Sequence, residues 1–76
     1  MKLIMLNDDI HSFEEVIYLL GSYLTYPKSQ LISIVSLVDN VGWCSVMESE
    51  NTASISDAMS YLTKQGLSLK IEDSDV

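Results

Sequence analysis

The residues best suited to chemistry form a short polar run near the N-terminus. The sequence Asn-Asp-Asp at positions 7–9 follows directly after the apolar run at positions 3–6. Ser12 and Glu15 then show the S-x-x-E spacing of a capping box, which predicts that a helix begins at Phe13. The three polar side chains should therefore lie in a strand-to-helix loop. Two adjacent carboxylates in such a loop form either a solvated acidic turn or a site that holds a cation, which could be a metal ion or an amine.

His11 lies in the same loop, two residues after the acidic pair. A metal site would have to combine it with Asp8, Asp9 and Asp39, and the chain contains no second histidine. One histidine with carboxylates supplies too few of the nitrogen and sulfur ligands that zinc prefers. We therefore expect His11 to be a solvent-facing loop residue, and we expect neither a metal nor another cofactor. No base is available to activate a serine, so the sequence does not predict an enzyme.

Length and charge limit the remaining classes of function. The chain has 76 residues, of which 47% are hydrophobic, as expected for one domain with a packed core. Four Lys against eleven Asp and Glu give a net charge of −7. This charge argues against nucleic acid and anionic membrane surfaces as partners, and it favours basic or amine-bearing ones. The apolar runs are too short to span a membrane, and a signal peptide is not expected.

Apolar periodicity and turn signals predict six elements. They are a strand at 2–6, a helix at 13–25, a helix from Pro27 to Gly42, a strand at 43–47, a helix from Ser54 to Gly66, and a strand at 67–71. The order βααβαβ predicts an α+β fold, a single small α/β sandwich in which three helices cover one face of a three-stranded antiparallel sheet. Trp43 is expected to be partly in the core, and would be a candidate partner contact if exposed. The acidic tail from about residue 72 is expected to be frayed.

The pattern of strand, Asn-Asp-Asp and helix from Lys2 onward resembles the ClpS adaptors of the Clp protease, which read the N-end rule. Val38–Gly42 occupies the position of the family's Val-His-x-x-Gly segment, and Gly66–Leu69 is similar to its last turn and strand. The resemblance covers essentially the whole chain. It implies that residues 1–76 form a single ClpS-like adaptor domain, located in the cytoplasm or in an organellar stroma or matrix.

The resemblance also implies a function and a set of site residues. ClpS proteins hold the free α-amino group and the large apolar side chain of a substrate's first residue, and they hand the substrate to a ClpA- or ClpC-type AAA+ unfoldase. In this chain the amine would be held by Asn7, Asp8 and Asp9, with Asp39 in place of the family's histidine. The apolar pocket would be lined by Phe13, Val16, Val35, Val38 and Leu69.

Several positions depart from the family pattern. Asp39 replaces the histidine, while Phe13 and Val35 stand where the family often has methionine. The family usually carries a flexible N-terminal extension needed for delivery, and we expect this chain to lack it because the first strand begins at residue 2. These departures leave open a second hypothesis, in which a divergent ClpS-like protein docks on the unfoldase and inhibits or redirects it without binding N-degron substrates.

Overall fold

The computed structural model describes residues 1–8 and 10–73 of the chain. Its elements, in order, are β1 (Lys2–Leu6), α1 (Phe13–Tyr23), α2 (Lys28–Val41), β2 (Trp43–Glu48), α3 (Thr52–Lys64) and β3 (Ser68–Glu72). The predicted succession of strands and helices is confirmed. The last strand extends one residue into the stretch predicted as a frayed tail, and residues 74–76 of that tail lie outside the described residues.

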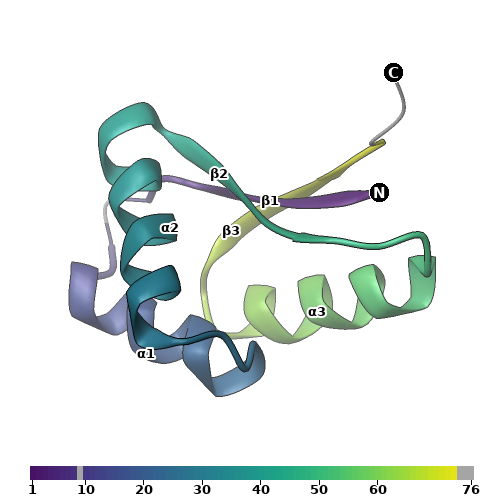
Figure 1. Cartoon of the computed structure of the whole chain (residues 1–76), viewed down its shortest axis with the longest axis horizontal. Helices are drawn as coiled ribbons and strands as arrows, with labels where there is room; N and C mark the ends of the chain where they lie inside the picture. The colour runs from purple at the N-terminus through teal and green to yellow at the C-terminus, as the bar shows by residue number, and fades with distance from the viewer. Residues whose placement is uncertain (9, 74–76) are drawn as a thin grey trace.

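The three strands form one antiparallel sheet in the order β2-β1-β3, so that β1 lies in the centre (Figure 1). Leu3 pairs with Met47 and Ile4 with Ser45, which leaves Val46 as the extra residue of a β-bulge. The hydroxyl of Tyr26 donates a 2.7 Å hydrogen bond to the Val46 carbonyl. The carbonyl of the bulged residue is therefore hydrogen-bonded. The three-stranded antiparallel sheet with three helices confirms the predicted α+β fold.

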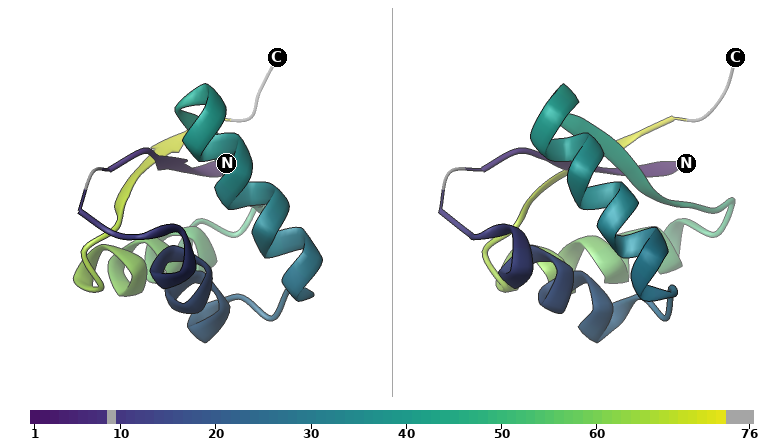
Figure 2. Two further views of the ribbon diagram at one scale, coloured as in Figure 1. Left: turned by 90° about the vertical axis from the view of Figure 1, so that its left-hand side faces the viewer. Right: turned by 60° about the vertical axis from the view of Figure 1, so that its left-hand side comes forward.

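The core lies between the sheet and the three helices, which all cover the same face (Figures 1 and 2). Leu3 and Met5 of β1 point to this face, because alternate side chains of a strand point the same way. Each helix contributes buried apolar residues to the core, namely Leu20 of α1, Leu31, Ile34, Val35 and Val38 of α2, and Ile55, Ala58 and Leu62 of α3. This shared core fixes the helix ends around the loop that follows β1.

Within the described part of the chain, the opposite face of the sheet carries no helix. Trp43 lies on this face, opposite Leu6, and 53% of its surface is exposed. The expectation that Trp43 is partly in the core was therefore wrong. The first residue of an edge strand has fewer neighbours than a central one, so its ring is left largely open to solvent.

Two helix boundaries differ from the predicted ones near the α1–α2 connection. Helix α1 ends at Tyr23, two residues early, and the buried Leu24 follows in an extended conformation. Helix α2 begins at Lys28, because Pro27 has an extended ψ of 150° and serves as the N-cap residue. Gly42 ends α2 with a φ of 106°, a left-handed conformation that glycine adopts without strain.

Helix α3 begins at Thr52, before the predicted start at Ser54. The side chain of Asn51 accepts hydrogen bonds from the backbone N–H groups of Ala53 and Ser54, at 3.0 and 3.3 Å. Asparagine is a strong N-cap residue, and here it outcompetes the weaker Ser-x-x-Asp signal. Within the described residues, no helix is long and apolar enough to cross a membrane.

Candidate functional site

The loop after β1 is fixed at both of its ends. The backbone N–H of Asn7 donates to the Gly42 carbonyl at 3.1 Å, which ties the end of β1 to the end of α2. At the other end, Ser12 Oγ accepts from the Glu15 N–H at 3.2 Å, and Glu15 Oε1 accepts from the Ser12 N–H at 2.9 Å. The predicted capping box is therefore confirmed. Its hydrogen bonds hold the pKa of Glu15 below its usual value.

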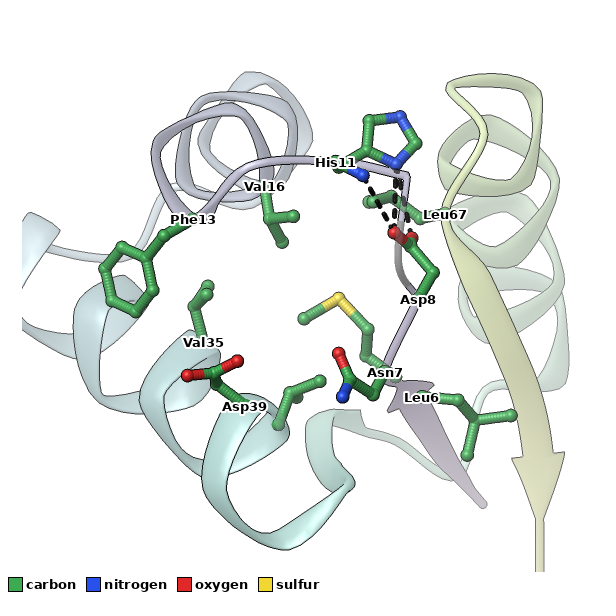
Figure 3. A pocket seen from close by; sticks show the side chains of 11 residues that line it. Leu6, Asn7, Asp8, His11, Phe13, Val16, Val35, Asp39 and Leu67 are labelled. Atoms are coloured by element: carbon green, nitrogen blue, oxygen red, sulfur yellow. Dashed lines mark hydrogen bonds and ion pairs between the residues drawn. The ribbon is translucent and has the colours of Figure 1, made fainter.

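A small cavity of about 100 Å³ opens between this loop, the first turns of α1, the C-terminal half of α2 and the turn before β3 (Figure 3). Polar side chains lie on two sides of its opening. Val35 and Asp39 of α2 stand across the opening from Asp8 and His11 of the loop. The remaining lining residues are Met5, Leu6, Asn7, Phe13, Val16, Val38 and Leu67.

Most residues proposed from the sequence are brought together here. The cavity is lined by Asn7, Asp8, Phe13, Val16, Val35, Val38 and Asp39. Asp9 lies outside the described residues. Leu69 is half-buried opposite Met5 on the sheet, and the wall at this place is formed by Leu67 instead. Leu67 precedes β3 and is nearly fully buried, so it reaches the cavity from the turn.

Asp8 is held by its own loop. Its Oδ1 atom accepts hydrogen bonds from the backbone N–H groups of Ile10 and His11, both at 3.0 Å. Burial alone would raise the pKa of the Asp8 carboxyl, but these two hydrogen bonds and the contact with the His11 ring outweigh it and hold the pKa below its usual value. Asp8 is therefore ionised at neutral pH and has a structural role in closing the turn.

His11 does not face solvent, contrary to the expectation from the sequence. Only 14% of its side chain is exposed, and its Nδ1 atom lies 3.2 Å from Asp8 Oδ2. The ring packs on the backbone of Gly66, where a Cβ atom would come within 3.1 Å of the ring. The Asp-x-x-His spacing could have predicted this contact from the sequence, because an aspartate that closes a turn brings the third residue after it close to its carboxylate.

Asp39 differs from Asp8 in having no such partners. Within the part of the chain that the structure describes, its carboxylate makes no hydrogen bond or ion pair. It lies exposed in the last turn of α2, a turn without a basic residue. The negative end of the helix dipole adds to its charge there, so this side of the opening attracts cations.

Apolar side chains make up the rest of the cavity. Met5, Val38 and Leu67 are buried beneath it, and Val16 and Val35 form its two facing walls. Phe13 lies at the rim with 41% of its surface exposed. The family resemblance placed the valines in the pocket, but it did not include Met5 and Leu67, whose approach to the cavity depends on how β1 and β3 pair.

This arrangement suits a ligand that joins a cationic group to an apolar one. The carboxylates of Asp8 and Asp39 can accept hydrogen bonds from an ammonium, while an apolar side chain fills the cavity between them. Among residues 1–8 and 10–73, no group of three or more His, Cys, Asp or Glu side chains is arranged to hold a metal ion.

Comparison with known proteins identifies a family for this chain. No curated protein matches the chain significantly. A protein family does match, and its description is "ATP-dependent Clp protease adaptor protein ClpS". The match covers residues 1–71, which include the loop, the cavity, the first five elements of the fold and β3 up to Ile71. The chain therefore belongs to the ClpS family of Clp protease adaptors.

Proposed function

We propose that this adaptor binds the free α-amino group and the apolar side chain of a protein's first residue, and presents that protein to a ClpA- or ClpC-type unfoldase. The observation that carries the proposal is an apolar cavity with a carboxylate on each side of its opening. An N-terminal residue has both matching parts, since its ammonium and its side chain leave the same Cα atom.

The two parts of such a ligand contribute differently. Burying a large apolar side chain contributes roughly 1.5–3 kcal/mol. Charge-assisted hydrogen bonds from an ammonium contribute about as much again and fix its orientation. An acetylated N-terminus loses its charge and all but one of its donors, so it keeps only the apolar contribution. The proposal therefore predicts strong discrimination between free and acetylated peptides.

The size of the cavity bears on the side chain that it accepts. A dry cavity of about 150 Å³ binds benzene. At about 100 Å³, this cavity is smaller and opens to solvent, and we propose a leucine-sized aliphatic group rather than an indole ring as its occupant. Val35 lies on the wall of this cavity, and the partly exposed Phe13 lies at its rim. Among N-terminal residues, leucine is therefore the expected ligand.

Isothermal titration calorimetry with a panel of peptides that differ only in the first residue tests the proposal. Peptides with a free N-terminal leucine should bind, and their N-acetylated forms should not. Asp39→Asn should weaken binding because an amide is a weaker acceptor for an ammonium than a carboxylate. Asp57→Asn is the matched control, since it makes the same charge change on the exposed side of α3, away from the cavity.

Equal affinity for free and acetylated peptides would contradict amine recognition. If no peptide binds while a purified ClpA- or ClpC-type unfoldase does, the chain docks on the unfoldase without reading N-termini. That outcome would favour the hypothesis of an inhibiting or redirecting protein.

A further inference from the structure

The His11 side chain is held from two sides inside the candidate site. Its Nδ1 atom lies 3.2 Å from Asp8 Oδ2 and 3.4 Å from Asp8 Oδ1. On the other side the ring touches the turn between α3 and β3, where a Cβ on Gly66 would lie 3.1 Å from Cε1 and 3.2 Å from Nε2. The absence of a side chain at Gly66 therefore makes room for the imidazole.

Asp8 has three polar partners in its own loop, and they are distributed unevenly over its two oxygens. Oδ1 accepts the backbone N–H groups of Ile10 and His11, while Oδ2 faces the His11 ring. A carboxylate oxygen has two acceptor positions. Oδ1 is thus filled, and Oδ2 keeps one position for a donor that comes from the cavity. Figure 3 shows the ring and the carboxylate together on one side of the opening.

We propose that His11 is a positioning residue for amine recognition, and that protonation of its imidazole weakens the binding of the ligand's ammonium. This inference rests on the proposed function. In the neutral form with a proton on Nδ1, the ring donates to Asp8 Oδ2 and aims the carboxylate while leaving its charge uncompensated. In the protonated form, the imidazolium neutralises Asp8 and repels a second cation in the same cavity.

The charges around the ring make the site sensitive to this proton. The charged side chains on the elements around His11 are Asp8 in the loop, Glu15 in α1, Asp39 across the cavity in α2, and Lys64 in the last turn of α3. The C-terminal end of α3 lies beside the ring and favours a cation there.

The test measures binding of a peptide with a free N-terminal leucine and a fluorophore at its C-terminus by anisotropy, from pH 5.5 to 7.0. Over this range the peptide amine stays protonated, because its pKa is about 8. The wild-type protein should bind about fivefold more weakly at pH 5.5 than at pH 7.0, as expected for one added charge at close range in a hydrated site.

Two variants separate positioning from a merely structural role. His11→Asn can still donate a hydrogen bond to Asp8 but cannot be protonated, so its affinity at pH 7.0 should stay within about twofold of wild type and should not change with pH. His11→Ala removes the donor, so its affinity should be lower at every pH and equally flat. Circular dichroism establishes that each variant is folded.

The outcomes are distinct. If the wild-type protein binds the peptide and its pH profile matches that of His11→Asn, His11 does not act on the amine and the inference is overturned. If His11→Ala does not fold, the comparison of wild type with His11→Asn still shows whether protonation of His11 weakens peptide binding. If the wild-type protein binds no free N-terminal peptide at any pH, the proposed function itself fails, and the inference fails with it.

Discussion

Replacing Asp8 tests whether the loop or the ligand depends on this carboxylate. The side chain accepts two backbone N–H groups at 3.0 Å and faces the His11 ring at 3.2 Å. Hydrogen bonds to a charged group are worth about 1.5–3 kcal/mol each when buried, and solvent screening at the surface reduces this value. We therefore expect Asp8→Ala to lower the free energy of unfolding by about 1–2 kcal/mol in total.

For a domain of this size, that loss corresponds to a melting temperature lower by roughly 5–15 °C. Asp8→Asn gives the matched comparison, because its amide oxygen still accepts the two backbone N–H groups while the charge is gone. We expect Asn to be much less destabilising than Ala, and yet to weaken binding of a free N-terminal peptide about as much. Calorimetric unfolding and peptide titration on the same three proteins measure both quantities.

The pH dependence gives the sign of the charge effect. The pKa of Asp8 is lower in the folded protein than its usual value of about 3.9, so the stability that its charge provides is present above that pH. It is lost as the pH falls through the folded-state pKa. The difference in unfolding free energy between wild type and Asp8→Asn should thus become smaller as the pH falls from 6 to 3. An unchanged melting temperature for Asp8→Ala at pH 7 would refute the structural role of Asp8.

Two further predictions concern local structure. Asn51→Ala removes the cap of α3 and should cost about 1 kcal/mol of unfolding free energy in urea titrations, whereas an unchanged value would mean that the cap is dispensable. Gly42→Ala and Gly66→Ala both place a side chain at a positive φ, which costs about 1–2 kcal/mol. Gly66→Ala should cost more, because its Cβ also meets the His11 ring while that of Gly42 meets no atom within 4 Å. Equal losses would argue against that contact.

Much of the fold follows from local signals in the sequence. The capping box of Ser12 and Glu15 fixed the start of α1, and Gly42 marked the end of α2. Both signals act through atoms a few residues apart, so they need no knowledge of the tertiary structure. The start of α3 was missed because Asn51 and Ser54 compete as caps, and the backbone conformation before the helix decides between them.

The site was harder to predict where it depends on contacts between distant segments. The approach of Gly66 to His11 joins the first loop to the last turn of the chain, and the packing of α3 against α1 and the sheet sets that distance. The same packing brings Leu67 rather than Leu69 to the cavity. Alternation along a strand gives both leucines one face, and it does not say which of them reaches the end of the sheet where the loop lies.

Asp8 and Asp39 stand on opposite sides of one cavity, but the fold treats them differently. The carboxylate of Asp8 accepts hydrogen bonds from its own turn with or without a ligand, so this side of the site is preorganised for binding. Asp39 has no partner among the described residues, and it lies at the negative end of the α2 dipole, where a carboxylate costs roughly 0.3–1 kcal/mol. An asparagine would avoid that cost. The stability of the free protein therefore gives no reason for a carboxylate at this position, whereas an ammonium bound beside Asp39 in the proposed site would offset both its charge and the helix dipole.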